Sequence, residues 1–341
     1  MNKTFASDNF SGAHPKVLEE IIKINNGHQG AYGTDEYTDL GKKIIIEKLG
    51  ANKVYFMLNG TGTNITILDS LTNNYGAVIC SNMAHILTHE SGAASKIANI
   101  TLLPVDTTDG KITIDGIKPY LYFKESYHFP KPQVISISQP TEMGAVYTVE
   151  ELKELTSFAH ENGLKVHMDG ARISNAAAFL NVSLKELTYS SGIDALSFGM
   201  AKNGIMFGEA AVFFNGSAPE DFDYIRKQNL QLQSKMRFIS GQYLTILKDD
   251  LWLENAIIAN ENAEYLVKEL SKINGIEIVQ KPSGNIMYVK FPKKINKELQ
   301  NFMYFYIENE ESNMARLVTN FDTLKSEIDS FIEKIKELML K

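Results

Sequence analysis

The stretch DALSFGMAKNGIMFGEAAVFF, residues 194–214, contains two apolar segments with a lysine between them. Residues Ala195–Gly199 and Ala210–Phe214 are short and almost entirely apolar, which is typical of buried strands. Lys202 lies between them in a turn of small residues. A lysine that serves only solubility is expected on an exposed helix face or loop. Lys202 therefore either extends its amine to water or has a chemical role.

The composition of the chain is that of a globular protein. Its 341 residues suffice for one large domain and a smaller one, with 44% hydrophobic and 22% charged residues. A net charge of −7 without a run of basic residues argues against a nucleic-acid partner. The single cysteine, Cys80, excludes an intrachain disulfide and a cysteine-based zinc cluster, and no metal site is expected. No signal peptide or membrane-spanning stretch is visible, so we predict a cytoplasmic protein without a membrane partner.

The middle of the chain alternates between strand-like and helix-like segments. A helix is expected from Thr148, which forms a capping-box pattern with Glu151, to the stop at Gly163. Another is expected from about Ile65 to Leu71. This alternation predicts an α/β fold with a mainly parallel sheet. Further strands are expected at residues 54–58, 77–81, 99–105, 134–138 and 165–169.

The pattern changes at about residue 246. Two long amphipathic segments, 251–272 and 323–340, enclose shorter strand candidates at 276–280, 285–291 and 314–320. We therefore predict a large domain over residues 1–245 and a small C-terminal α+β domain over residues 246–341. The first twenty or so residues are expected to pack with the small domain.

Three segments place polar groups at the ends of expected strands, where open α/β sheets bind ligands. In NGTGTN (59–64), Gly60 and Gly62 permit close backbone approach, and Thr61 with the helix N-terminus offers donors to a phosphate. In HMDGARIS (167–174), Asp169 ends a buried strand. Lys202 is the third group. Each has an ordinary alternative: a Gly/Thr turn, an aspartate that caps the next helix, and a lysine that reaches to solvent.

Taken in order, the three groups suit pyridoxal phosphate. This cofactor needs a phosphate cradle, a carboxylate that keeps its ring nitrogen protonated and a neutral lysine amine that binds its aldehyde carbon. Partial burial would lower the pKa of Lys202 and so supply the neutral amine. The residues alone therefore predict that Lys202 is the cofactor lysine.

Several motifs together resemble the low-specificity L-threonine aldolases, which are fold-type-I pyridoxal-phosphate enzymes of the β-eliminating lyase group. The resemblance covers essentially the whole chain. It implies an aspartate-aminotransferase-like large domain, a small C-terminal domain, and a homotetramer built as a dimer of dimers with shared active sites. It also implies aldol cleavage of L-threonine and L-allo-threonine to glycine and acetaldehyde. The motifs are FASDNFSG (5–12), AYGTDEYT (31–38), NGTGTN (59–64), HMDGARISNAAAFL (167–180), FGMAKNG (198–204) and SKMRFIS (234–240).

The resemblance assigns roles around the cofactor. Lys202 would bind it covalently, Asp169 would pair with the ring nitrogen, and Gly60 and Thr61 would hold the phosphate. His85 matches a histidine that stacks on the ring close to the substrate hydroxyl, and it is our candidate for accepting the hydroxyl proton. Without the match, His85 would be interpreted as a histidine at a helix start that bonds to backbone.

The resemblance also assigns residues to the substrate and to a neighbouring subunit. Arg172 would lie near the phenolic oxygen of the cofactor and help to bind the substrate. Arg316 would clamp the α-carboxylate, with Ser7 beside it. His128 matches a second family histidine, although a loop residue beside two prolines needs no function. In the family, basic residues of a neighbouring subunit approach the phosphate, and Lys235 and Arg237 match their positions. As surface charges, the two residues would need no such role.

Departures from the family pattern leave alternatives open. Met200 precedes the lysine where relatives have small residues, and Pro140 lies in the loop under the ring, so both put the substrate preference in doubt. Cleavage of another β-hydroxy amino acid of the phenylserine type, β-elimination and transamination would all use the same Lys202 and Asp169. A non-catalytic nucleotide-binding protein is a rival from another class, but neither a G-x-G-x-x-G nor a G-x-x-x-x-G-K-[ST] motif supports it.

Overall fold

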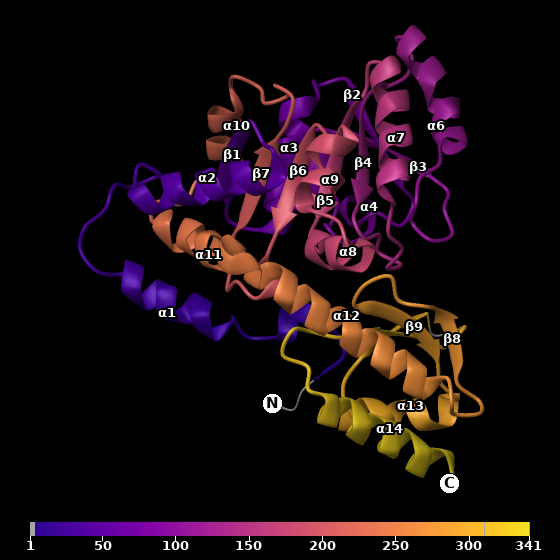
Figure 1. The fold of residues 1–341 in the computed structure, drawn as a ribbon. Helices are drawn as coiled ribbons and strands as arrows, with labels where there is room; N and C mark the ends of the chain where they lie inside the picture. The colour runs from indigo at the N-terminus through magenta and orange to yellow at the C-terminus, as the bar shows by residue number, and fades with distance from the viewer. Residues whose placement is uncertain (1–3, 310, 341) are drawn as a thin grey trace.

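The structure, a computed structural model, describes residues 4–309 and 311–340. Figure 1 shows a large α/β body joined by one long helix to a smaller body that carries the C-terminal residues. The large body is built on a seven-stranded sheet in the order β1-β7-β6-β5-β4-β2-β3. Its strands are β1 (Lys53–Met57), β2 (Gly76–Ser81), β3 (Thr101–Val105), β4 (Lys131–Ser138), β5 (Lys165–Gly170), β6 (Ala195–Gly199) and β7 (Glu209–Phe213).

The sheet is mainly parallel, which confirms the predicted fold class. Strands β3, β2, β4, β5 and β6 pair in parallel, whereas β7 runs antiparallel to both β6 and β1. The register places Ser138, Asp169 and Ser197 side by side near the carboxyl ends of β4, β5 and β6. At the start of β7, Glu209 lies opposite both Met57 and Gly199. The turn that carries Lys202 joins β6 to β7, as the opening stretch predicts.

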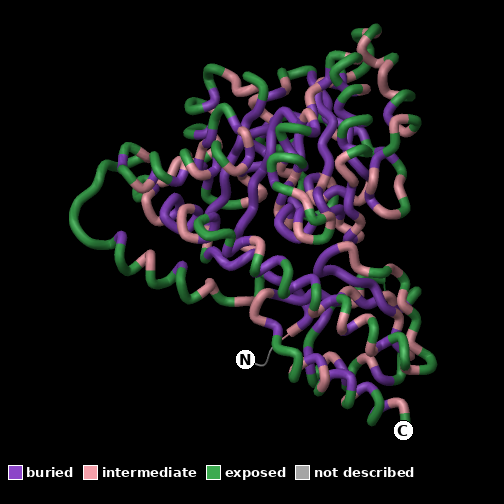
Figure 2. Tube along the Cα trace, viewed as in Figure 1, coloured by how far each residue is buried: buried purple, intermediate pink, exposed green. Residues whose placement is uncertain are grey.

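Helices cover both faces of this sheet, because its strands are apolar on both sides. Along β2, for example, Ile79 packs in one hydrophobic cluster and Val78 in the other. The α-helices of the large body are α2 (Glu36–Leu49), α3 (Gly60–Leu71), α4 (His85–Thr88), α5 (Ala93–Ile97), α6 (Ile114–Leu121), α7 (Val149–Glu161), α8 (Ile173–Leu180), α9 (Leu184–Leu187), α10 (Phe222–Gln228) and α11 (Arg237–Leu247). Short 3₁₀ helices are η1 (Asp8–Phe10), η2 (Tyr122–Glu125), η3 (Tyr189–Ser191), η4 (Ala201–Asn203) and η5 (Lys248–Asp250). Figure 2 shows the buried chain concentrated along the sheet.

Two helix starts illustrate how local sequence sets these elements. At α7 the predicted capping box is present: Glu151 N donates to Thr148 Oγ1 (3.2 Å), and Thr148 N donates to Glu151 Oε2 (2.7 Å). The prediction for α3 was wrong at its start, since the helix begins at Gly60 rather than near Ile65. Asn59 caps it, with Gly62 N donating to Asn59 Oδ1 at 2.8 Å. The expected glycine turn is therefore the first turn of the helix.

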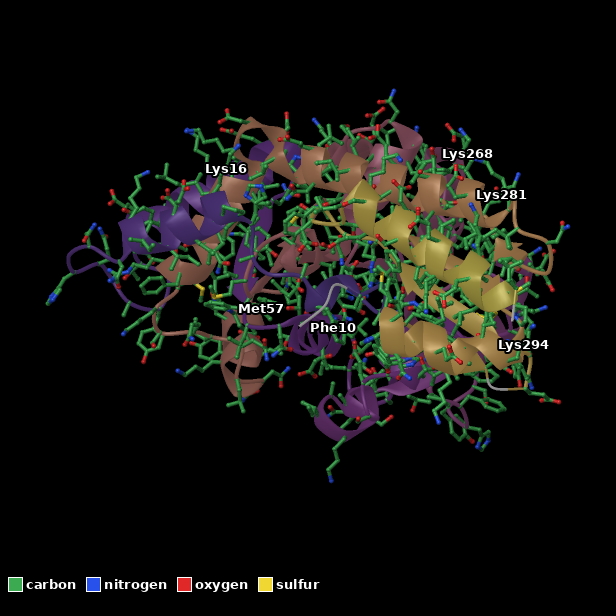
Figure 3. The ribbon with its side chains drawn as sticks, turned by 90° about the horizontal axis from the view of Figure 1, so that it is seen from below. Phe10, Lys16, Met57, Lys268, Lys281 and Lys294 are labelled. Carbon is green, nitrogen blue, oxygen red and sulfur yellow. The ribbon has the colours of Figure 1, made fainter. Side chains whose placement is uncertain are left out.

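The small body has a four-stranded antiparallel sheet in the order β10-β11-β9-β8. Its strands are β8 (Glu277–Gln280), β9 (Ile286–Lys290), β10 (Tyr306–Asn309) and β11 (Met314–Val318), and its helices are α12 (Leu251–Leu270), α13 (Lys293–Phe302) and α14 (Lys325–Met339). Viewed from below in Figure 3, the exposed Lys268, Lys281 and Lys294 lie around its outer side. None of the helices in the described ranges has the length and apolarity needed to span a membrane.

The N-terminal segment belongs to both bodies. Phe5 N donates to Tyr304 O (2.9 Å), Val318 N donates to Phe5 O (2.8 Å), and the Phe5 ring lies in the core of the small body. Helix α1 (Pro15–Ile24) instead packs against α11. Helix α12 contacts α8 of the large body as well as α14 and β9. The division at residue 245 stays a prediction.

Candidate active site

A cavity of about 400 Å³ opens at the carboxyl ends of the parallel strands and the N-terminus of α3. It is lined by the turn after β1, the start of α4, the loop after β4, the end of β5, the η4 turn and the start of β7. The structure brings together here six of the residues singled out from the sequence, which are Gly60, Thr61, His85, Asp169, Arg172 and Lys202.

Lys202 is held in the η4 turn by contacts with α12. Asn203 Nδ2 donates to Trp252 O (3.0 Å), and Asn255 Nδ2 donates to Asn203 O (2.7 Å). The following Gly204 has a φ of 117°, which side chains rarely tolerate. Burial lowers the pKa of the Lys202 amine, and the nearby positive charge of Arg172 lowers it further. Both effects favour a neutral, nucleophilic amine.

Asp169, at the end of β5, directs its carboxylate to the cavity. Oδ1 accepts from Ala171 N (3.0 Å) and Oδ2 accepts from Asn64 Nδ2 (2.8 Å). The next helix, α8, has Arg172 at its N-cap position and no side-chain cap, so Asp169 does not cap it. The simple capping interpretation of this aspartate was therefore wrong.

His85 is oriented by buried side chains that the sequence analysis missed. Its Nδ1 lies 2.8 Å from Oε1 of the buried Glu90, which also accepts from Asn64 Nδ2 (3.0 Å). The hydrogen bond to Glu90 raises the pKa of His85 above its usual value, against the opposing effect of burial. The backbone N–H of His85 donates to Glu142 Oε1 (2.8 Å). Its ring thus bonds to a carboxylate, and the alternative of a ring bound to backbone was wrong.

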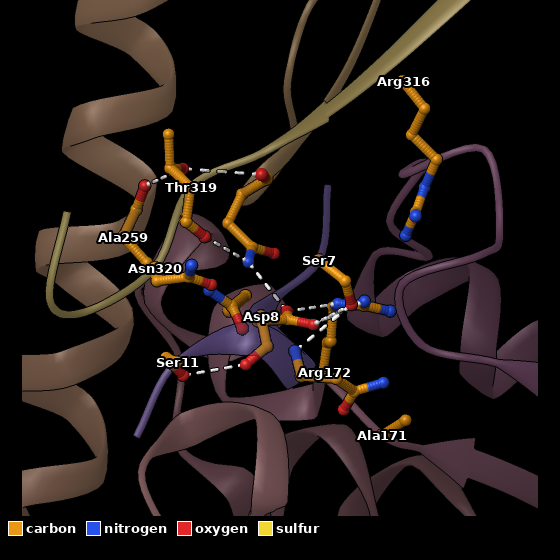
Figure 4. Close-up of polar contacts among 12 residues, drawn as sticks. Ser7, Asp8, Ser11, Ala171, Arg172, Ala259, Arg316, Thr319 and Asn320 are labelled. Atoms are coloured by element: carbon orange, nitrogen blue, oxygen red, sulfur yellow. Dashed lines mark hydrogen bonds and ion pairs between the residues drawn. The ribbon is translucent and has the colours of Figure 1, made fainter. Parts of the chain in front are cut away.

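Arg172 forms a two-pronged ion pair with Asp8, which the sequence analysis also missed (Figure 4). Nε donates to Asp8 Oδ2 (2.6 Å) and Nη2 donates to Asp8 Oδ1 (2.7 Å). Asn285 Nδ2 donates to the same carboxylate at 3.0 Å. Burial alone would raise the pKa of Asp8, but the charge and hydrogen bonds of Arg172 outweigh it and hold that pKa below its usual value.

Ser7 and Arg316 lie beside this ion pair without lining the cavity. Ser7 Oγ accepts from Asn9 N (3.2 Å), and Arg316 Nη1 on β11 lies 3.5 Å from Ala6 O. Figure 4 shows the guanidinium of Arg316 directed toward Ser7 and Arg172. Burial lowers the pKa of Arg316, and electrostatic repulsion from the guanidinium of Arg172 lowers it further. This region suits a small anion such as a carboxylate.

Three further expected site residues lie outside this cavity. His128 is exposed in the loop after η2, its ring 4.3 Å from that of Tyr127. Lys235 is exposed, and Arg237 Nη1 donates to Gly27 O at 3.3 Å. Of the two departures noted above, Pro140 lines the cavity.

Met200 does not line the cavity. It is fully buried, with Ser174 Oγ donating to its sulfur at 3.6 Å. Met200 therefore does not face the space for a substrate, and its effect on the substrate preference stays a prediction.

The cavity fits pyridoxal phosphate. The cap of α3 engages the N–H groups of Gly62 and Thr63, which leaves those of Gly60 and Thr61 for an anion within the described part of the chain. A carboxylate and a lysine of lowered pKa line the same space. Gly62 itself serves packing, because a Cβ there would lie 2.1 Å from Gln231 Nε2.

Comparison with known proteins agrees with this chemistry. Residues 4–293 match the family model described as beta-eliminating lyase. The chain is 38% identical to the low specificity L-threonine aldolase of a Pseudomonas species, over 99% of this chain and 98% of that one. It is 37% identical to the Pseudomonas aeruginosa enzyme of that name, over 98% and 95%. A solved structure of Leishmania major threonine aldolase superposes with a TM-score of 0.93 at 28% identity, covering 99% of both chains.

Proposed function

The chain belongs to the beta-eliminating lyase family, and we propose that it is a pyridoxal-phosphate enzyme that cleaves L-threonine and L-allo-threonine to glycine and acetaldehyde. The two relatives at 37–38% identity are named low specificity L-threonine aldolase, and the match covers nearly their whole length. The observation that carries the proposal is the meeting of Lys202, Asp169 and the N-terminus of α3 at one cavity.

The residues that would hold the cofactor each have a chemical reason. Lys202 would offer an amine of lowered pKa to its aldehyde carbon, Asp169 a carboxylate to its ring nitrogen, and the N-terminus of α3 its N–H groups to the phosphate. When bound, pyridoxal phosphate supplies an electron sink for the pair released as the Cα–Cβ bond breaks.

The two arginines and Ser7 would hold the substrate carboxylate. Asp8 fixes two nitrogens of Arg172 and balances its charge, which keeps that guanidinium in one orientation. In the described part of the chain no ion pair is found for Arg316, and its charge remains for an incoming anion. A carboxylate held at this point fixes which bond of the α-carbon faces the electron sink, and so which bond breaks.

His85 is the group placed to take the proton of the β-hydroxyl. Glu90 accepts from Nδ1, so Nε2 remains as the basic atom. A half-exposed ring held by a buried carboxylate can reach a substrate in the cavity without losing its orientation.

The assembly and location are part of the proposal. We propose a homotetramer in which Lys235 and Arg237 serve a neighbouring copy, supported by their position outside the cavity of their own chain. Light scattering of the purified protein would measure its mass. We propose the cytoplasm and glycine metabolism as its setting, supported by the expected product and the single buried thiol of Cys80.

The first test is acetaldehyde release from L-threonine by the protein loaded with pyridoxal phosphate, followed by a coupled dehydrogenase, with glycine measured in parallel. Lys202→Ala should lower the rate roughly 10³-fold or more, a loss of about 4 kcal/mol of transition-state stabilisation, while circular dichroism stays unchanged. A loaded protein that releases no acetaldehyde, or a variant as active as the wild type, would refute the proposal. Turnover of phenylserine, or release of 2-oxobutyrate and ammonia from threonine, would then identify the alternative reaction.

A further inference from the structure

Glu209 is a buried carboxyl group at the cavity, and the proposed reaction does not use it. It is the first residue of β7 and is 8% exposed. Its register partners, Met57 of β1 and Gly199 of β6, lie directly before the two turns that carry Gly60 and Lys202. Glu209 therefore sits between the phosphate-binding turn and the turn of the cofactor lysine.

Two glycines define where this carboxyl group points. A Cβ on Gly199 would lie 3.0 Å from Glu209 Oε2, and a Cβ on Gly60 would lie 3.4 Å from Oε1. Glu209 lines the cavity, yet Oε2 is buried and has no hydrogen-bond partner within the described ranges. A buried, unpartnered oxygen is costly unless a ligand engages the group. The other oxygen, Oε1, lies on the side of Gly60, which is the first residue of α3 and also lines the cavity.

The charges around Glu209 favour its neutral form. Burial raises the pKa of Glu209 to about 8, and the negative charge of Asp169 adds to this rise, while Lys202 opposes it. The remaining titratable neighbour, Tyr243 of α11, donates its hydroxyl to Phe198 O and carries no charge. At neutral pH the carboxyl group consequently keeps its proton and can donate a hydrogen bond.

We propose that Glu209 is a third donor to the phosphate of the cofactor, beside the N–H groups of Gly60 and Thr61. This inference rests on the proposed use of pyridoxal phosphate. A protonated carboxyl group can donate to a phosphate oxygen. An ionised carboxylate in the same position would instead repel the negatively charged phosphate. Cofactor affinity should accordingly be coupled to the proton on Glu209.

The test is a titration of the apoprotein with pyridoxal phosphate, followed by fluorescence between pH 6.5 and 9.5, in wild type, Glu209→Gln and Glu209→Ala. In wild type, Kd should rise by up to about tenfold per pH unit above pH 8 as one proton is lost. Glu209→Gln keeps a donor of the same shape but has no proton to lose, so its Kd should not show this rise above pH 8. Glu209→Ala should bind about tenfold to a hundredfold more weakly at pH 7.

Pyridoxal, which lacks the phosphate, is the control ligand. Its affinity should be the same in all three proteins, since Glu209 is assigned to the phosphate. Equal affinity of wild type and Glu209→Ala for pyridoxal phosphate would overturn the inference. An equal loss of affinity for pyridoxal would also overturn it, because Glu209 would then act through Lys202 and not on the phosphate. The Gln variant keeps the test valid if the Ala variant unfolds. The measurement is of binding, so a protein that binds as expected but does not cleave threonine refutes only the proposed reaction.

Discussion

At the scale of single residues, the site depends on buried carboxylates that hold functional side chains. Glu90 holds the His85 ring and Asp8 holds the Arg172 guanidinium. Asn64 links this arrangement to Asp169, which we propose to bind the cofactor, because its amide donates to both Glu90 and Asp169. The side chains proposed to react or to bind are therefore positioned by hydrogen bonds with neighbouring polar groups.

Replacement of Glu90 should move the acid limb of the pH–rate profile. Hydrogen bonding to Glu90 raises the pKa of His85, so in wild type the basic form is lost as pH falls through a value above 6.5. In Glu90→Gln this pKa should fall, and the acid limb of kcat should shift to lower pH, with a several-fold loss of the plateau rate. Glu150→Gln, an exposed change on α7, is the control. An unmoved acid limb in Glu90→Gln would exclude His85 as the base that this limb reports.

The sequence predicted the residues that meet at the cavity better than the side chains that hold them in place. Lys202 and Asp169 were identified because Asp169 ends a buried apolar strand and Lys202 lies just after another, where a polar side chain needs an explanation. Asp8 was not, since its partner Arg172 is 164 residues away and no local pattern encodes that pairing. Glu90 could have been suspected, as it lies only five residues after His85. Its burial depends on how α3 packs, which the sequence does not show.

At the scale of elements, the first turn of α3 serves both the fold and the proposed phosphate site. Asn59 caps the helix, and the cap leaves the N–H groups of Gly60 and Thr61 directed to the cavity. The strands around it were predicted well because continuous apolar runs are typical of buried parallel strands. The start of α3 was placed too late, because two glycines in six residues favour a turn over a helix. Strand β10 was missed because it is mostly exposed and lacks an apolar pattern.

Removal of the α3 cap should weaken cofactor binding as well as stability. Asn59→Ala should lower the free energy of unfolding by about 1 kcal/mol, since one orphan N–H group loses its acceptor. It should also raise the Kd for pyridoxal phosphate, because the first turn then frays.

Thr148→Ala is the matched control for this change. Thr148 caps α7 through the same kind of bond and does not line the cavity. It should cost a similar free energy, measured by urea unfolding, and leave the Kd unchanged. An equal effect of both variants on the Kd would show that α3 has no special part in binding.

At the scale of the whole molecule, the N-terminal segment joins the two bodies at the cavity. Phe5 bonds to the small sheet, and three residues later Asp8 pairs with Arg172 at the end of β5 and with Asn285 before β9. The presence of a second, smaller sheet followed from the sequence, because the strand candidates at 276–280, 285–291 and 314–320 come after the change of pattern near residue 246, whereas the domain boundary stays a prediction. This connection did not, since it depends on contacts between opposite ends of the chain.

Loss of the Asp8 carboxylate should loosen this connection. Asp8→Asn leaves the buried charge of Arg172 unbalanced and should lower the free energy of unfolding by about 3 kcal/mol. The KM for threonine should rise, because Arg172 loses its fixed orientation. The pKa of Asp8 is lowered in the folded protein, so its contribution is present at neutral pH and is lost as pH falls below the usual aspartate range.

The control for this prediction is Asp115→Asn, which removes an aspartate from an exposed pair with Lys118. It should leave both stability and KM unchanged. A wild-type stability and KM in Asp8→Asn would mean that Arg172 does not need this partner.

The path of the N-terminal segment has a consequence for biosynthesis. The hydroxyl of Thr4 bonds to the carbonyl of Tyr304, which is 300 residues further along the chain. At ordinary rates of translation a ribosome needs roughly 15 to 60 s to add that many residues. During this interval the large sheet can fold, but residues 4–8 lack the strands against which they lie and Asp8 lacks Asn285. A nascent chain should therefore acquire a complete substrate site only when its synthesis is nearly finished.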